Sequence, residues 1–163
     1  MRLHTSFKIG CPADMLVCPL NTRELSAVLK KCGELSVPFF IIGNGSNLLV
    51  SDGGIEGAVI SLAGLNRITV CGEELKCGAG AMLSAVCKKA LDEELTGLEF
   101  AYGIPGTVGG AQVSEKHAGF VINLGYATCK DVQALVKKVQ EEVYKGDGVK
   151  LEPEIIIVGR SED

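Results

Sequence analysis

The stretch Phe39-Phe40-Ile41-Ile42-Gly43-Asn44-Gly45-Ser46-Asn47-Leu48-Leu49-Val50 decides the fold. The apolar run 39–42 follows a proline and has the length and flanks of a buried strand, and it ends abruptly in a glycine-rich loop. Glycine permits positive φ angles and a close approach of the backbone, so the N–H groups of such a loop can converge on a phosphate. The side chains of Ser46 and Asn47 add hydrogen-bonding groups. This junction indicates a phosphate-binding turn.

A second loop of the same kind follows at Tyr102-Gly103-Ile104-Pro105-Gly106-Thr107-Val108-Gly109-Gly110-Ala111. It is too rich in glycine to be regular for long. Two such loops suit the pyrophosphate of a dinucleotide. The simpler interpretation is a pair of tight turns, because glycine-rich loops are common. Glycine content alone leaves both interpretations open.

Two familiar nucleotide-binding motifs do not fit. The first loop is followed by 48–54, which has no helical pattern, so the Gly-x-Gly-x-x-Gly fingerprint of a Rossmann fold lacks its structural context. The chain also has no Gly-x-x-x-x-Gly-Lys-Ser/Thr sequence. Neither a Rossmann fold nor a P-loop NTPase is therefore supported.

The flanking sequence alternates strand and helix patterns. Asn21 with Glu24 three residues on predicts a capping box that opens a helix, and Thr128 predicts the cap of a later helix. A middle helix with an apolar stripe from Leu83 to Leu91 is expected to stop near Gly97. The predicted strands are 13–20, 39–42, 57–62, a hairpin of 67–70 with 74–77, and 151–158, where Pro153 delays the start or keeps the strand at an edge.

Length and composition set the class. The 163 residues are 47% hydrophobic and 22% charged, with 21 glycines and few aromatics, which is typical of a globular chain with an aliphatic core. This length forms one domain, or one main domain with a small appendage. The element pattern makes the fold class α+β.

Charge and cysteine content narrow the partners. A net charge of −4 with scattered Lys and Arg gives no basic face, so no nucleic-acid partner is expected. No apolar stretch reaches membrane-spanning length, and the N-terminus lacks a leader pattern, so we expect a soluble cytoplasmic protein with no membrane partner. Seven cysteines without a Cys-x-x-Cys pair predict reduced, mostly buried thiols. With only His4 and His117 as histidines, no metal site is expected.

Ordered motifs resemble one family, the UDP-N-acetylenolpyruvoylglucosamine reductases of bacterial cell-wall synthesis, which have the vanillyl-alcohol-oxidase-like (PCMH-type) FAD-binding fold. The matching motifs are Thr5-Ser6-Phe7-Lys8-Ile9-Gly10 with Pro12-Ala13-Asp14, then 43–49, then 103–111. The stretches 112–120 and Leu151-Glu152-Pro153-Glu154 resemble motifs of the family's C-terminal substrate domain.

The resemblance also implies an internal shortening. In the family a long segment separates the loop that ends Gly-Gly-Ala from the Ser-Glu-Lys-His motif, whereas here the two are fused at Gly109-Gly110-Ala111-Gln112. We therefore expect an incomplete FAD-binding region at 1–111 and a remnant of the substrate domain at 112–163. Nothing in this chain matches the family's Tyr-Arg arginine or its proton-donating serine.

The resemblance assigns roles to named residues. It implies that Glu154 is the surviving catalytic group, which helps to polarise the substrate carboxylate and supports protonation. Without it, Glu154 reads as a solvent-facing carboxylate and His117 as a structural histidine. Lys116 and His117 belong to the substrate-domain motif, with no role assigned. The implied cofactor-binding residues are Gly43, Asn44, Gly45, Ser46, Asn47, Leu48, Gly103, Ile104, Pro105, Gly106, Gly109 and Gly110.

The implied activity is FAD-dependent and NADPH-driven reduction of the nucleotide sugar UDP-N-acetylenolpyruvoylglucosamine to UDP-N-acetylmuramate. We expect it to be crippled by the missing segment. The alternatives are a non-catalytic flavin- or nucleotide-binding remnant and an interaction module. Open strand edges left by the shortening also predict self-association.

Overall fold

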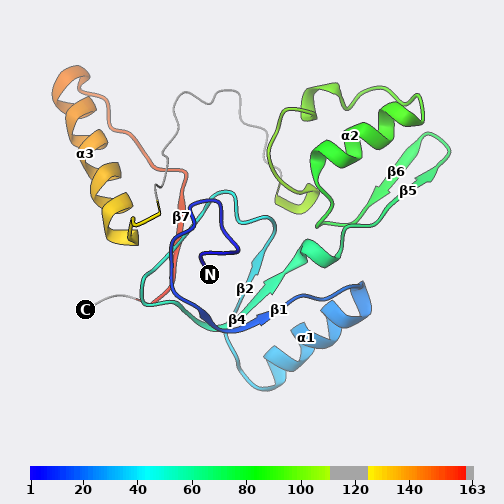
Figure 1. Ribbon diagram of the computed structural model, residues 1–163, viewed down its shortest axis with the longest axis horizontal. Coiled ribbons are helices and arrows are strands. Elements are labelled where there is room, and N and C mark those ends of the chain that lie inside the picture. Colours follow the sequence, from blue (N-terminus) through cyan, green and yellow to red (C-terminus); the bar gives the residue numbers. More distant parts are fainter. Residues whose placement is uncertain (111–124, 161–163) are drawn as a thin grey trace. The chain divides into compact units, whose positions relative to one another are not determined.

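The computed structural model describes residues 1–110 and 125–160 (Figure 1). Both strands and helices occur along the chain, which confirms the α+β class. The strands are β1 (Ala13–Val17), β2 (Phe39–Ile42), β3 (Leu48–Val50), β4 (Ile55–Ser61), β5 (Ile68–Cys71), β6 (Glu74–Cys77) and β7 (Ile156–Val158), and the α-helices are α1 (Thr22–Glu34), α2 (Leu83–Asp92) and α3 (Cys129–Asp147). No helix in these ranges is long and apolar enough to cross a membrane.

The chain forms two compact units, each assembled from separated segments. Unit 1 consists of Met1–Asp14, Asn47–Glu56 and Phe120–Asp163, and unit 2 of Met15–Ser46 and Gly57–Gly119. The chain therefore passes from unit 2 to unit 1 between Ser46 and Asn47, inside the first glycine loop. From its motifs, the chain is predicted to divide at residue 111, into a part that resembles the FAD-binding region and a part that resembles the substrate domain. That division is by resemblance and not by compactness, and it stays a prediction.

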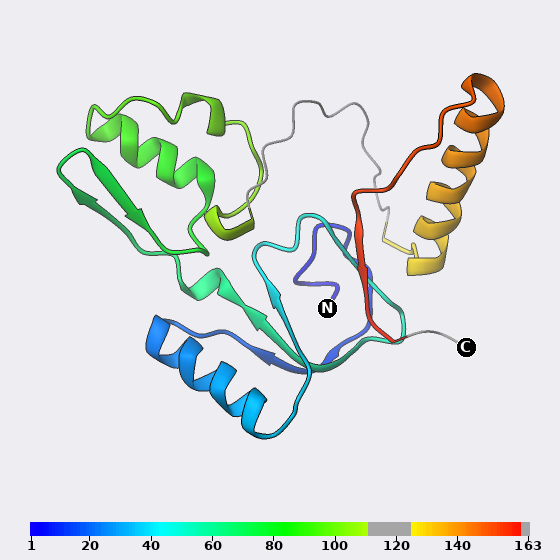
Figure 2. The same cartoon turned by 180° about the vertical axis from the view of Figure 1, so that it is seen from behind.

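The main sheet of unit 2 has the strand order β1-β4-β2, so β4 is the central strand. β2 runs parallel to β4 with Phe39 opposite Ala58 and Ile42 opposite Ser61. The central position explains why Val59 and Ile60 are fully buried. Figures 1 and 2 both show α1 beside this sheet, with its chain leading directly into β2.

The N-terminus of α1 follows the prediction with one difference. The Asn21 side chain accepts a hydrogen bond from the Glu24 N–H, as the cap requires. The Glu24 carboxylate, however, accepts from the Leu20 N–H and the Asn21 side-chain amide rather than from the Asn21 N–H. The predicted Asn21 cap is confirmed, and the Glu24 carboxylate accepts from the backbone N–H of Leu20, one residue before the cap.

The rest of unit 2 contains the predicted hairpin and α2. β5 and β6 pair antiparallel, and Gly72 at their turn has a φ of +62°. The expectation that α2 stops near Gly97 is wrong, because the helix ends at Asp92. Glu94 adopts a φ of +57°, which turns the chain out of the helix before the glycine is reached.

Unit 1 is built around a short parallel pair and α3. β3 pairs with β7 in the register Leu48 with Ile156 and Val50 with Val158, an extended segment that the sequence did not predict after the loop. The predicted cap of α3 is confirmed by a full capping box between Thr128 and Asp131. The apolar cluster of this unit comprises Ile9, Leu49, Cys129 and Val132.

The cysteines differ from the expectation of mostly buried thiols. Cys32, Cys87 and Cys129 are buried, but Cys11, Cys18 and Cys71 are exposed and Cys77 is intermediate. The exposed thiols lie outside the interior of helices and central strands: Cys18 follows β1, and Cys71 stands at the hairpin turn. All seven are free.

Candidate functional site

The first glycine loop leaves β2 and turns at once. Gly45 has a φ of +64°, a conformation that side-chain-bearing residues rarely adopt. Within the described part of the chain, no hydrogen bond is formed by the N–H groups of Asn44, Gly45 or Ser46. Successive unused N–H groups around a left-handed residue are the arrangement that receives an anion.

The second loop is fastened to residues 79–83, where α2 begins. Leu83 donates its N–H to the Gly106 carbonyl oxygen, and Val108 and Gly109 donate to the carbonyl oxygens of Ala81 and Ala79. A Cβ at Gly109 would lie 2.8 Å from the Ala79 Cβ, so glycine is needed here for packing. Gly110 donates to the Thr107 carbonyl oxygen. The N–H groups of Gly109 and Gly110 are thus engaged within the protein.

Thr107 brings the two loops together within unit 2. A Cβ built on Gly43 would lie 2.6 Å from the Thr107 Oγ1, and one built on Gly110 would lie 3.5 Å from it. A side chain at position 43 would force the Thr107 hydroxyl to move, so glycine allows this approach as it stands. The predicted residues Gly43 and Gly110 therefore meet around one hydroxyl group.

The Thr107 hydroxyl is an unsatisfied buried group. Thr107 is 3% exposed, and its Oγ1 has no hydrogen-bond partner among the described residues. Leaving a buried polar group unpaired costs about 1–3 kcal/mol, so native proteins rarely keep one without a reason. A phosphate oxygen would accept a hydrogen bond from this hydroxyl, and this residue set fits a dinucleotide pyrophosphate. Thr107 lies within the predicted motif but was not among the predicted binding residues, although a hydroxyl residue between loop glycines is a signal for one.

Asn47, Leu48 and Glu154 come together in unit 1. The Asn47 Nδ2 donates to the Glu154 carbonyl oxygen at 2.9 Å, across 107 residues of sequence. Ile156 returns a hydrogen bond from its N–H to the Asn47 carbonyl oxygen at 3.2 Å. Leu48 is 5% exposed and packs as part of β3, whereas Glu154 is exposed. A cofactor contact of Leu48 would therefore come from its backbone.

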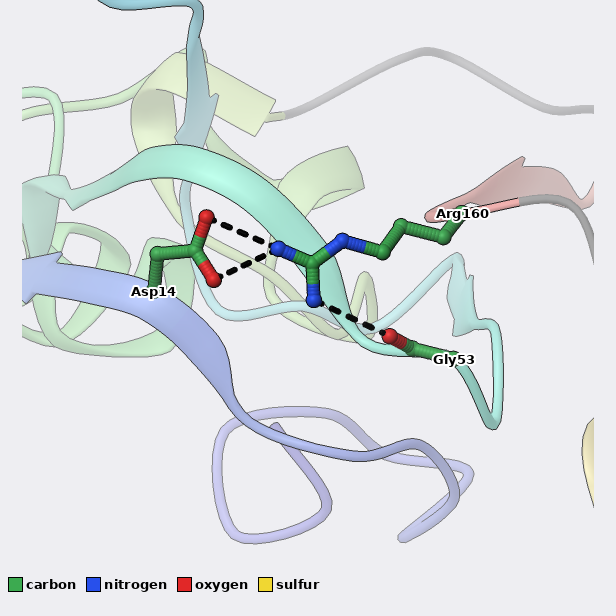
Figure 3. A network of polar contacts seen from close by, with 3 residues as sticks. All are labelled: Asp14, Gly53 and Arg160. Carbon is green, nitrogen blue, oxygen red and sulfur yellow. Dashed lines mark hydrogen bonds and ion pairs between the residues drawn. The ribbon is translucent and has the colours of Figure 1, made fainter.

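The C-terminal strand is tied to the segment after β3. Arg160 Nη2 contacts both carboxylate oxygens of Asp14, at 2.7 and 2.9 Å, and its Nη1 donates to the Gly53 carbonyl oxygen (Figure 3). The Arg160 carbonyl oxygen accepts from the Ser51 Oγ at 2.7 Å. Arg160 therefore holds β7 in place and is committed to this network.

Other predicted features lie outside this arrangement. Lys116 and His117 fall outside the described residues. In residues 1–110 and 125–160, no three His, Cys, Asp or Glu side chains gather into a metal-binding group, and the expectation of no metal stays a prediction for the whole chain. Burial raises the pKa of the Cys77 thiol, and this residue is on the hairpin, away from both loops in sequence.

Several known proteins are similar to this chain. A protein-family model described as an FAD binding domain matches residues 13–139. UDP-N-acetylenolpyruvoylglucosamine reductases from Clostridium novyi and Clostridium perfringens are 50% and 51% identical to it over 111 residues. These matches cover 68% of this chain and 36% of each relative, so the chain spans little more than a third of the curated relatives it matches.

A solved structure agrees with the sequence matches. The crystal structure of UDP-N-acetylenolpyruvylglucosamine reductase from Thermus caldophilus is similar with a TM-score of 0.52 and 33% sequence identity. The similarity covers 68% of this chain and 38% of that chain. The resemblance inferred from the motifs, and the FAD-binding type of fold that it implied, are confirmed.

Proposed function

The chain belongs to the FAD binding domain family, and on this premise we propose that its two glycine-rich loops hold the pyrophosphate of FAD. The observation that carries the proposal is the buried Thr107 hydroxyl, which has no partner in the described residues and faces Gly43. A pyrophosphate oxygen at this hydroxyl would remove the cost of the unpaired group. The unused N–H groups of Asn44, Gly45 and Ser46 would add donors from the first loop.

The predicted cofactor residues then divide by role. Gly45 supplies the conformation of the first loop, and Gly43 supplies space for the Thr107 hydroxyl. Gly109 fixes the second loop against Ala79. The segment before Thr107 contains the predicted residues Gly103, Ile104, Pro105 and Gly106. Gly110 follows Thr107 three positions later in the same loop. The proposed site thus combines direct donors with residues that only shape the loops.

FAD supplies the hydride chemistry of this family when it is bound. The protein's part is to bind and orient the cofactor by its phosphates, through Thr107 and the N–H groups of the first loop. Glu154 is proposed to act on a substrate, by polarising a carboxylate and supporting protonation. Its backbone is held in unit 1 by Asn47.

The substrate and the electron donor are proposals taken from the relatives. We propose UDP-N-acetylenolpyruvoylglucosamine as the nucleotide-sugar substrate, NADPH as the donor, and a cytoplasmic role in peptidoglycan synthesis. The matched length is little more than a third of the relatives. From the motif resemblance, we expect no counterpart in this chain of the family's arginine or serine. The chain alone is therefore expected to bind FAD and to turn over little or no substrate.

Self-association remains part of the proposal. Ile156 and Ile157 on β7 are 52% and 49% exposed, and β7 pairs only with β3 among the described strands. An apolar strand with an open edge is a site for pairing between copies. Light scattering on the purified chain tests this, and a strictly monomeric species at high concentration would exclude it.

Titration of FAD into the chain, followed by flavin fluorescence, tests the proposed function. A saturable change at one FAD per chain is expected. No saturable change in a protein shown to be folded by circular dichroism would contradict FAD binding and leave the interaction-module alternative.

Turnover is tested separately with the FAD-loaded chain. Anaerobic NADPH consumption in the presence of substrate, scored by product mass, should give no useful rate. Loss of a positioned proton donor costs about 10²- to 10⁴-fold and loss of an electrostatic clamp costs about 10²- to 10³-fold more. Product at rates near those of ordinary enzymes would show that other residues of this chain fill the missing roles.

A further inference from the structure

Asn47 holds the backbone on the C-terminal side of Glu154 at two points. Its Nδ2 donates to the Glu154 carbonyl oxygen at 2.9 Å, and its own carbonyl oxygen accepts from the Ile156 N–H at 3.2 Å. Pro153 immediately before Glu154 has a fixed φ and no N–H group. The segment 153–156 is thus stiff at its start and anchored twice to one residue.

The anchoring continues along the same strand. The Ser51 N–H donates to the Val158 carbonyl oxygen at 2.8 Å, and the Ser51 Oγ donates to the Arg160 carbonyl oxygen at 2.7 Å. Between Asn47 and Ser51, the β3 residues Leu49 and Val50 pair with Ile157 and Val158 of β7. The segment that carries Glu154 therefore follows residues 47–51 as one ladder, and Asn47 is its first contact.

Asn47 is also the residue that ends the first glycine loop. It follows Ser46 directly, and Gly45 sets the direction of the chain by its positive φ. A ligand that fixes the backbone of residues 44–46 would therefore also fix the position of the Asn47 Cα, from which the side chain extends. The Asn47 side-chain amide, which the sequence predicts to contact the cofactor, donates one hydrogen bond to the Glu154 carbonyl oxygen.

We propose that Asn47 is a positioning residue for Glu154, through which occupancy of the first glycine loop orders the segment that carries this carboxylate. The ligand response rests on the proposed function, since it needs FAD in the loop. The positioning itself is measurable without a ligand.

Gln140 offers a matched control. Its Nε2 donates to the Leu151 carbonyl oxygen at 2.9 Å, which is the same side-chain amide bonded to the same C-terminal segment three residues before Glu154. Gln140 lies on α3 and not on a glycine loop. Removing it deletes an equivalent hydrogen bond without touching the connection to the loop.

The experiment is amide hydrogen exchange of residues 150–158, with and without saturating FAD, in the full chain and in the variants Asn47→Ala, Asn47→Asp and Gln140→Ala. Asn47→Asp keeps the shape of the side chain and removes the donor, so it stands in if Asn47→Ala does not fold. Without FAD, both Asn47 variants should exchange the Ile156 N–H about 2- to 10-fold faster, the factor that one net hydrogen bond contributes. Gln140→Ala should leave that rate unchanged.

FAD should slow exchange at residues 154–158 in the full chain and in Gln140→Ala, and not in the Asn47 variants. The proposal is overturned if the FAD-loaded chain shows no slowing there, or if the slowing persists in both Asn47 variants. If the unmodified chain binds no FAD, the proposed function fails, and the ligand-free rates decide the positioning role alone. Unchanged Ile156 exchange in both Asn47 variants would then overturn it.

Discussion

The two loops are both rich in glycine and are held in different ways. The second loop is fastened by residues earlier in the chain, since Val108 and Gly109 donate to the carbonyl oxygens of Ala81 and Ala79. The first loop is unattached at Asn44, Gly45 and Ser46 within the described residues, and its last residue, Asn47, is bonded to Glu154 more than 100 positions away. The second loop is therefore fixed by its own backbone hydrogen bonds. The first loop leads directly into Asn47, which is bonded to the C-terminal segment.

The difference separates three uses of glycine. Gly45 provides a positive φ, Gly43 provides space next to a hydroxyl group, and Gly109 provides space next to a backbone turn. Substitution at the first two should act mainly on ligand binding, and substitution at the third on stability. The predictions below test this division.

The largest effect is expected at Gly45. Gly45→Val places a β-branched residue at a positive φ and closes the approach to the loop N–H groups. Loss of two or more hydrogen bonds to a charged ligand predicts a fall in FAD affinity of about 100-fold or more. Flavin fluorescence titration measures it.

Gly72→Val is the matched control for this change. Gly72 has nearly the same φ, +62°, at the turn between β5 and β6, and an added Cβ there meets nothing within 4 Å. Both variants carry the same backbone strain, so both should lose similar stability. Equal loss of FAD affinity in the two variants would show that strain, and not the loop, explains the result.

The next largest effect is expected at Thr107. Thr107→Val removes one donor to a charged group, which predicts an FAD affinity about 10- to 100-fold lower. Because an unpaired buried hydroxyl is also removed, the ligand-free variant should melt no lower than the unmodified chain. FAD titration measures the loss of affinity, and calorimetry of the ligand-free variant measures the melting temperature.

Thr5→Val tests whether the effect belongs to the site. Thr5 is the other buried threonine whose hydroxyl lacks a partner in the described residues, and it lies in unit 1. Its replacement should leave FAD affinity within about 2-fold, well under one hydrogen bond to a charged group. An FAD affinity that falls equally in both variants would argue against the assignment of Thr107.

A smaller effect, on stability alone, is expected at Gly109. Gly109→Ala puts a methyl group 2.8 Å from the Ala79 Cβ and 3.1 Å from the Ala79 carbonyl oxygen, and such overpacking costs about 1–3 kcal/mol. Ala79→Gly in the same chain should restore part of the loss. Urea denaturation measures both, and a double variant no more stable than Gly109→Ala would exclude this contact as the cause.

The smallest effect is a pH dependence at α3. Hydrogen bonds from the Thr128 N–H and hydroxyl hold the pKa of the Asp131 carboxyl below its usual value. Because the folded pKa is the lower one, this contribution is complete above the unfolded pKa, about 4, and is lost as pH falls through the folded pKa. Helicity should fray first at the α3 N-terminus in acid, and Asp131→Asn should remove that part of the pH dependence.

Local signals in the sequence predicted most of the elements. Asn21 and Thr128 cap helices because their side chains reach the first free N–H groups, and this depends only on neighbouring residues. The delay of β7 by Pro153 is equally local. The early end of α2 was missed because Glu94 takes a left-handed conformation that glycine was expected to supply at position 97.

Contacts between distant segments were not predictable in this way. β3 is only three residues long and exists because β7 pairs with it from the far end of the chain. The hydrogen bond between Asn47 and Glu154 depends on that pairing. For the site, the loops and their glycines were identified from sequence, but the hydroxyl of Thr107 gains its meaning only from its burial against Gly43.

The central claim, that the two loops hold the FAD pyrophosphate around Thr107, is tested most directly by phosphorus NMR of FAD in the presence of the chain. Both pyrophosphate resonances should shift and broaden with the unmodified protein and return toward the free positions with Thr107→Val and Gly45→Val at the same concentrations. A flavin signal that saturates while the phosphorus resonances stay unchanged would show that FAD is held elsewhere, and would contradict the account.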